Sequence, residues 1–237
     1  MTGVRNKIIY VADRALTAVA VIAGILILLI SVYSILDNIW QYQGAVDDTL
    51  LSYKPKLDEP YDTSAIITED QVAWLCIDDT RIDHPVMQGE DNYEYLSKDP
   101  YGEYRLSGAV FLDCRNDRNF QDEYSILYGH HMEHGAMFGA LDDFRDRAYF
   151  DAHRTGRLVT QDAVYELTIF AVSGANAADR TVFDPVGRTR EEILDFLKEN
   201  AVIFEGPAEG ERFLALSTCS ADENADRLIV IAAMKEK

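Results

Sequence analysis

The sequence has few of the residues that mark several common protein classes. Its 237 residues include three cysteines, six prolines and 14 glycines. An odd and small number of cysteines argues against a disulfide-stapled scaffold. The low proline and glycine content excludes a collagen-like or low-complexity chain. Hydrophobic residues make up 48% of the sequence, which is enough for one sizeable core and excludes a disordered tail.

Basic residues are also scarce. The chain has 22 Lys and Arg against 41 Asp and Glu, which gives a net charge of −19. Because nucleic-acid binding needs a basic face that displaces counterions, we expect no nucleic-acid partner. The acidic clusters are expected to be solvated surface, with an extracellular calcium site among them kept as an open alternative.

One long segment contains no charge at all. Residues 15–36 read ALTAVAVIAGILILLISVYSIL, and a helix of this length spans about 33 Å against a hydrocarbon core of about 30 Å. The segment is too long for the core of a signal peptide and has no small-residue cleavage site after it. Arg5, Lys7 and Arg14 precede it, which predicts a cytoplasmic N-terminus and an extracellular remainder. We therefore expect a single-pass protein of the cell membrane, held by one uncleaved N-terminal helix.

The remainder of the chain has the pattern of a β-rich domain. We predict a cytoplasmic tail (1–14), a transmembrane signal anchor (15–36), a stalk with helical stretches (37–70) and a β-rich domain (71–237). Strands are expected at 73–77, 81–86, 108–112, 124–128, 156–160, 164–172, 212–216 and 227–233. Eight short strands predict a closed or nearly closed β-barrel. Helices are expected at 137–145 and 190–200, the second with Thr189 as its N-cap.

A candidate nucleophile stands at the end of one predicted strand. Cys219 closes the stretch Leu-Ser-Thr-Cys, and Arg227 begins the next strand. If the two strands pair as a hairpin, both residues flank the connecting loop, where a guanidinium would favour the thiolate. Taken alone, a buried structural cysteine beside a surface arginine is the commoner arrangement. Cys76 and Cys114 lie in apolar segments and are expected in the core.

Catalysis by cysteine usually needs an imidazole, which can be distant in the sequence. His130 and His131 both qualify, and the alternation of side chains along a strand allows only one of them to face a given site. His134 adds the alternative of a metal site on a helical turn, which the neighbouring glycines disfavour. His84 and His153 are expected to be structural or surface residues.

These motifs, in this order, resemble those of the sortases, the cysteine transpeptidases of Gram-positive surfaces. The resemblance covers roughly residues 70–237. Tyr-Gly-His-His-Met at 128–132 is similar to the class B form of the histidine motif. Two other stretches are similar to class B as well, IDHPVMQG at 82–89 and GAVFLD at 108–113, together with a long helix before the strand that leads to the cysteine.

The resemblance implies a mostly β fold, an eight-stranded sortase-type β-barrel with N-terminal helices. It implies Cys219 as nucleophile, His130 as the imidazole because it directly follows Gly129, and Arg227 as the catalytic arginine. Ser217 and Thr218 are implied as substrate-binding residues. The interval from cysteine to arginine is shorter than in other class B members, and Ser220 stands where some sortases have an acidic residue.

The activity implied is transpeptidation without a cofactor. The enzyme would cleave the C-terminal sorting signal of a surface protein after Thr, through a thioester, and transfer it to an amine of a cell-wall precursor. The alternatives are a pilus-polymerising sortase that joins pilin subunits, a plain cysteine hydrolase and a non-catalytic anchored β-barrel binding module. Pilus polymerases often have an N-terminal Asp-Pro-aromatic lid, and the stretch DEPY at 58–61 matches it poorly, which favours surface-protein anchoring.

Overall fold

The computed structural model describes residues 2–45, 48–61, 66–207, 212–219 and 226–237. Cys219 and Asp226 are described by their backbones only. The chain divides into two compact units, which meet between Gln43 and Gly44. Each unit is considered by itself below.

The first unit contains nearly all of one long helix, α1 (Thr2–Ala45). Within it lies the stretch Ile9–Asp37, which contains an 18-residue window with a mean hydropathy of 2.8 and no residue buried inside the protein. This stretch of 29 residues includes the predicted anchor at 15–36. By length and composition it is able to cross a bilayer, and the anchor stays a prediction.

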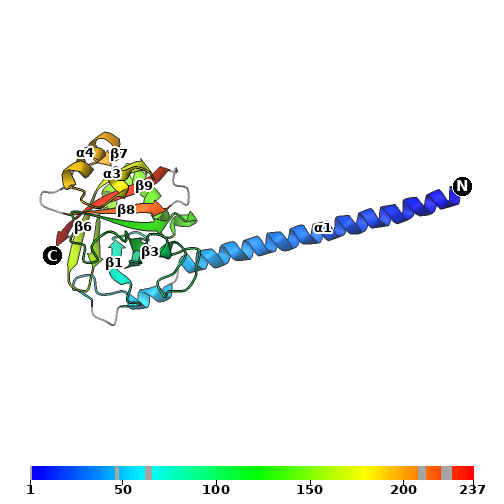
Figure 1. Ribbon diagram of the computed structural model, residues 1–237, viewed down its shortest axis with the longest axis horizontal. Helices are drawn as coiled ribbons and strands as arrows, with labels where there is room; N and C mark the ends of the chain where they lie inside the picture. Colours follow the sequence, from blue (N-terminus) through cyan, green and yellow to red (C-terminus); the bar gives the residue numbers. More distant parts are fainter. Residues whose placement is uncertain (1, 46–47, 62–65, 208–211, 220–225) are drawn as a thin grey trace. The chain divides into compact units, whose positions relative to one another are not determined.

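The second unit is built on a β-sheet that closes on itself (Figure 1). In the described residues the sheet contains β1 (Gln71–Ile77), β2 (Asp83–Met87), β3 (Val110–Leu112), β4 (Tyr124–His130), β5 (Thr155–Val159), β6 (Val164–Asn176), β7 (Ala201–Phe204), β8 (Arg212–Cys219) and β9 (Asp226–Glu236). The strand order is β5-β1-β2-β3-β4-β8-β9-β6-β7, and β5 also pairs with β6. That extra pairing closes a barrel of eight strands, and β7 pairs with β6 at Ala171–Ser173, beyond the part of β6 that pairs with β5. The predicted eight-stranded barrel is confirmed.

Strand β1 is apolar because both of its faces are covered. All seven residues of β1 are buried, and Trp74 and Leu75 at its centre are fully inaccessible. Such strands read as continuous hydrophobic runs rather than as alternating patterns. A core cluster that includes Phe111, Ile126 and Phe213 draws on several strands, so the barrel is packed rather than hollow.

Short helices fill the connections. They are η1 (Asp48–Tyr53), η3 (Glu94–Leu96), η4 (Glu133–Gly135), η5 (Phe138–Arg145), α2 (Arg147–Ala152), α3 (Arg180–Phe183) and α4 (Arg190–Asn200). The helix expected at 137–145 is a 3-10 helix that begins at Phe138, because Met137 has a φ of 50°. The helix expected at 190–200 has those bounds and a capping box between Thr189 and Glu192. Helix α4 packs on β6 and β7, with α3 beside it (Figure 1).

Candidate active site

Two strands that are distant in sequence bring the predicted nucleophile and imidazole together. Strands β4 and β8 are parallel neighbours, with a register that runs from Tyr124 opposite Phe213 to His130 opposite Cys219. Neighbouring strands lie about 4.8 Å apart. The backbones of His130 and Cys219 are therefore adjacent, at the C-terminal ends of the two strands.

The third predicted residue lies on the next strand of the barrel. Strand β9 pairs with β8 in antiparallel register up to Ser217 opposite Ile229, which confirms the predicted hairpin. The Leu228 amide also donates to Thr218 Oγ1 at 3.2 Å. Two residues further along this register, the position of Cys219 falls opposite that of Arg227. The loop residue Ser220 lies outside the described residues.

Two aromatic rings flank the guanidinium of Arg227. Its Cζ lies 6.0 Å from the centroid of the Tyr128 ring and 5.2 Å from that of Phe183. Both distances are within the range of cation–π attraction. Tyr128 belongs to β4, two residues before His130, whereas Phe183 ends helix α3. The half-buried Arg227 is therefore held between the barrel and the β6–α4 connection.

The His130 ring is oriented by a backbone carbonyl. Its Nε2 lies 2.7 Å from the Leu96 oxygen. A carbonyl can only accept, so Nε2 bears the hydrogen and Nδ1 is the nitrogen that can take up a proton. Gly108, with a φ of 60°, lies against the backbone of Tyr95 and Leu96, where a Cβ atom would meet both carbonyl oxygens. The position of the Leu96 carbonyl thus depends on a glycine.

The neighbouring His131 is directed elsewhere, as the alternation along a strand predicts. Its Nε2 lies 2.6 Å from Asp142 Oδ2 on η5, and the pair is half exposed. His131 lines a cavity of about 670 Å³ together with His134 and Tyr149. In the described ranges, no group of three or more His, Cys, Asp or Glu side chains is placed to hold a metal ion.

The two residues before the predicted nucleophile have little access to solvent. Ser217 is fully buried, and its Oγ donates to the Thr218 carbonyl at 3.3 Å. Thr218 is 6% exposed and accepts the Leu228 amide. Their assignment as substrate-binding residues stays a prediction.

The other cysteines and histidines are placed by packing. Cys76 is buried in β1, as expected. The expectation for Cys114 is wrong, because β3 ends at Leu112 and Cys114 lies half-buried in the turn that follows. Burial raises the pKa of both thiols, so neither is an activated nucleophile. His84 is half-buried in β2, and His153 stacks on Tyr149 with ring centroids 3.9 Å apart.

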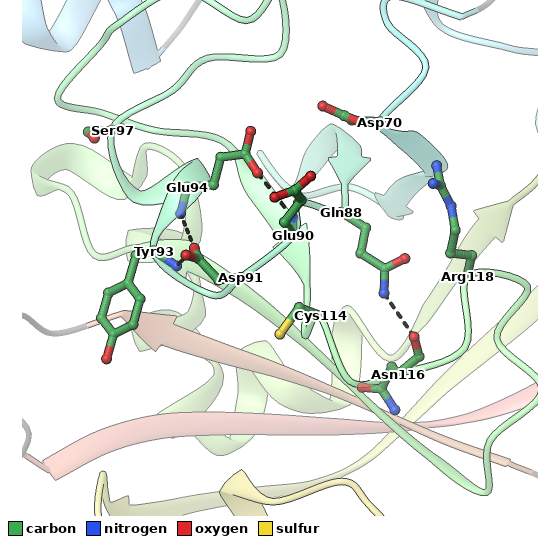
Figure 2. Close-up of a pocket in the computed structure, with 11 residues that line it drawn as sticks. Asp70, Gln88, Glu90, Asp91, Tyr93, Glu94, Ser97, Cys114, Asn116 and Arg118 are labelled. Atoms are coloured by element: carbon green, nitrogen blue, oxygen red, sulfur yellow. Dashed lines mark hydrogen bonds between the residues drawn. The ribbon is translucent and has the colours of Figure 1, made fainter.

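A pocket of about 1040 Å³ opens beside Cys114 (Figure 2). Carboxylates dominate its rim, including Asp70, Glu90 and Glu94, and Arg118 stands at one side. Among the described residues that line it, none is a predicted catalytic residue. One of its lining residues, Ser97, directly follows Leu96, the hydrogen-bond partner of His130.

Sequence reasoning missed three residues around Arg227. Phe183 and Tyr128 flank its guanidinium, and the buried Asp113 accepts the Tyr128 hydroxyl at 3.2 Å. Asp113 is the last residue of the stretch GAVFLD, whose likeness to class B sortases gives this carboxylate no chemical role. The usable signal was an acidic residue placed directly after an apolar strand, two positions before an arginine.

Comparisons with known proteins agree with this geometry. A family model described as the sortase domain matches residues 75–235. Sortase B of Staphylococcus aureus (strain NCTC 8325 / PS 47) is 30% identical over 173 residues, which cover 70% of this chain and 70% of that protein. Sortase B of Listeria monocytogenes serovar 1/2a (strain ATCC BAA-679 / EGD-e) is 32% identical over 165 residues, 68% of this chain and 67% of that protein. A crystal structure of a Streptococcus pyogenes class B sortase involved in pilus biogenesis has a TM-score of 0.65 at 35% identity, covering 81% of this chain and 100% of the other.

Proposed function

Because this chain belongs to the sortase family and is a class B-like cysteine transpeptidase, we propose that it attaches surface proteins to the cell wall. It cleaves a C-terminal sorting signal after Thr and transfers the new end to an amine of a cell-wall precursor. The observation that supports this most directly is the backbone pairing of His130 with Cys219. That pairing sets a candidate acid–base group beside a candidate nucleophile on rigid strands.

In the first step the Cys219 thiolate attacks the Thr carbonyl of the sorting signal. A carbon–sulfur bond forms, the peptide C–N bond breaks, and the leaving amine receives a proton. His130 supplies that proton from Nδ1, since its Nε2–H is committed to the Leu96 carbonyl. The product is a thioester between Cys219 and the surface protein.

In the second step an amine attacks the thioester and releases the enzyme. Nδ1 of His130 removes a proton from the attacking amine, and the thiolate leaves. Arg227 stabilises the oxyanion that develops in both steps, or holds the substrate backbone beside it. The rings of Tyr128 and Phe183 support this role, because they restrict the guanidinium before substrate binds.

Helix α1 anchors the enzyme in the membrane, with the barrel on the outer side. The support is the apolar stretch Ile9–Asp37 and the basic residues that precede its centre. An anchored enzyme shares one surface with a membrane-held substrate and a lipid-linked acceptor, which raises the effective concentration of all three.

Mass spectrometry of the full chain in detergent micelles, with a panel of sorting-signal peptides, tests the proposal. We expect cleavage after Thr, an amide product when an acceptor amine is present, and no product with Cys219→Ala. Cys114→Ala is the matched control, because it removes a different thiol and should retain activity. Acid product alone, whatever the amine, would indicate a cysteine hydrolase. Peptide binding without cleavage would indicate a binding module.

Pilus polymerisation is the second candidate, supported by the likeness to the Streptococcus pyogenes class B sortase involved in pilus biogenesis. The placement of Tyr61 speaks for wall anchoring instead. It is buried against Val159 and Val164, and Val164 lies about 36 Å along β6 from Ala175, the partner of Arg227. The stretch 58–61 is therefore not a lid over the site. Offering a lysine-bearing pilin and a wall-precursor amine in the same reaction separates the two functions.

A further inference from the structure

We infer that Asp113 is a positioning residue that fixes the guanidinium of Arg227 through two separate sets of contacts. The inference rests on the proposed function, because Arg227 is given its chemical role there. Asp113 lies outside the three predicted catalytic positions, and its carboxylate does not touch Arg227 in any contact that the structure records.

The Asp113 carboxylate is the centre of a buried hydrogen-bond cluster. Its side chain is fully buried, and it accepts five hydrogen bonds from Asn92, Arg115 and Tyr128. Arg115 binds it in a bidentate manner, with Nε to Oδ1 at 2.8 Å and a terminal nitrogen to Oδ2 at 2.7 Å. Bidentate pairs of this kind fix orientation as well as distance.

The Asp113 carboxylate is ionised in this cluster. Burial by itself would raise the pKa of this carboxyl, but the hydrogen bonds and charge of Arg115 outweigh burial and hold the pKa below its usual range. Asp113 therefore stays ionised at neutral pH. It acts as a fixed anion and not as a proton carrier.

The first set of contacts runs through Tyr128. Its hydroxyl donates to Asp113 Oδ2 at 3.2 Å, and its ring packs on Phe111 with centroids 5.5 Å apart. The other end of this chain of contacts is Arg227, whose Cζ lies 6.0 Å from the Tyr128 centroid. Asp113 thereby fixes one of the two rings beside the guanidinium.

The second set runs through Arg115 to helix α3. A terminal nitrogen of Arg115 donates to the Phe183 carbonyl at 2.8 Å, and the other donates to Asp184 Oδ1 at 3.1 Å. The Phe183 ring centroid lies 5.2 Å from Arg227 Cζ. Asp113 holds Arg115, Arg115 holds the end of α3, and α3 presents the second ring.

Helix α3 needs such support because it is only four residues long. A helix this short has no stability of its own in water. In addition to Arg115, it is tied to the barrel by the Tyr124 hydroxyl, which donates to the Val182 carbonyl at 3.0 Å. Without the Arg115 contacts, the end of α3 that bears Phe183 loses its direct link to the Asp113 cluster.

The consequence for chemistry is geometric. Arginine has a long side chain with many rotamers, and a shift of about 1 Å at a reacting centre can cost two orders of magnitude in rate. Arg227 is placed by its strand, and the two rings contribute to the orientation of its guanidinium. Substitution of Asp113 should therefore reduce the contribution of Arg227 to the rate of peptide cleavage. The contribution of His130 to that rate should not change.

The first test is a double-mutant cycle on kcat/KM for peptide cleavage by the full chain in detergent micelles. We expect Asp113→Asn to lower kcat/KM about tenfold in the wild-type background and less than twofold with Arg227→Lys, which keeps the charge but not the planar group. Loss of the same factor in both backgrounds would overturn the inference. Asp151→Asn is the matched control, because Asp151 pairs with Arg147 on the surface and should have no effect in either background.

A second variant tests the same inference without changing the buried Asp113 cluster. Phe183→Leu leaves the Asp113 cluster intact and removes one ring, and we expect it to lower kcat/KM about fivefold. Phe183→Tyr keeps an aromatic face and should restore kcat/KM to within twofold of wild type. Equal activity of the leucine and tyrosine variants would contradict the role of the ring.

Hydrogen exchange separates this inference from the proposed function, because it needs no substrate. In Asp113→Asn, the amides of residues 178–184 should exchange at least tenfold faster than in the wild type and in Asp151→Asn. Unchanged exchange would overturn the link from Asp113 to α3. Exchange could be faster in Asp113→Asn while the wild type forms no acyl-enzyme. That result would contradict the proposed function and would leave the link from Asp113 to α3 standing.

Discussion

At the scale of single residues, the orientation of His130 depends on Gly108. A methyl group there would meet the backbone oxygens of Tyr95 and Leu96, the latter at 2.9 Å, and the φ of 60° is already unfavourable for alanine. We expect Gly108→Ala to lower the free energy of unfolding by about 1–3 kcal/mol and kcat/KM by more than about tenfold, since the Leu96 carbonyl must move. Chemical denaturation and peptide-cleavage rates measure the two effects.

Gly187→Ala provides the control for that substitution. Gly187 has a φ of 67°, but no heavy atom lies within 4 Å of the Cβ position. Gly187→Ala should lower the free energy of unfolding by about 1 kcal/mol, which is the cost of backbone strain. Its activity should equal that of the wild type. If both variants lose activity alike, the orientation of His130 does not depend on contact between Gly108 and Leu96.

His84 gives a second prediction at this scale. Burial lowers its pKa to about 4, with a smaller opposing effect from the neighbouring Asp83. The folded protein therefore keeps His84 neutral while the unfolded chain, with a pKa near 6.5, binds a proton. The free energy of unfolding should fall as the pH decreases from about 6.5 to 4, by at most about 3 kcal/mol from this residue.

Urea unfolding at several pH values, compared with His84→Gln, isolates that effect. As the pH falls through this window, the wild type should lose more unfolding free energy than the variant. Parallel pH profiles would show that His84 titrates alike in the folded and unfolded states.

At the scale of secondary-structure elements, apolar patterning predicted the barrel well. All eight expected strands are the strands of the closed barrel, because continuous burial leaves a clear signal in segments such as Ala73–Ile77. Strand β7 was not predicted, since its four residues follow α4 without a break and two of them, Val202 and Phe204, are exposed. The strand expected at 108–112 ends at Leu112, as predicted, and Cys114, which was expected in the core, lies in the turn that follows.

The candidate site was harder to predict from the residues alone. The hairpin of β8 and β9 joins Cys219 to Arg227 locally, but the parallel pairing of β4 with β8 joins segments about ninety residues apart in the chain. No local pattern specifies that pairing, and the assignment of His130 rested on family likeness. The Asp113 cluster could not be predicted for the same reason, because two of its three partners, Asn92 and Tyr128, come from distant segments of the chain.

The packing of η5 on β4 gives a prediction at the element scale. A Cβ at Gly129 would lie 2.7 Å from the Phe138 ring, so this ring sits directly over the residue before His130. We expect Gly129→Ala to separate η5 from β4, to lower the free energy of unfolding by about 1–3 kcal/mol and to reduce activity. Gly174→Ala on β6, where nothing lies within 4 Å of the Cβ position, should be close to neutral in both measurements. Equal effects of the two substitutions would refute the close packing.

At the scale of the whole molecule, the proposed anchor and the strong negative charge give a prediction for the location of the enzyme. With a net charge of −19, the protein should not adhere to anionic head groups by electrostatics. Membrane association should therefore depend on the stretch Ile9–Asp37. We expect deletion of residues 1–37 to release the protein into the soluble fraction, and protease added to intact cells, after removal of the wall, to digest the barrel of the full chain.

Two results would contradict this arrangement. Membrane retention of the shortened chain would show a second attachment. Full protection of the barrel in intact cells, with digestion only after lysis, would show that it faces the cytoplasm.

The most direct test of the account is intact-mass spectrometry of the full chain quenched with acid during turnover of a sorting-signal peptide. The account predicts a transient mass increase equal to the N-terminal cleavage product, mapped by digestion to Cys219, which disappears when an acceptor amine is added. His130→Ala should not accumulate this adduct. A covalent adduct on any other residue, or product formation by Cys219→Ala, would contradict the account.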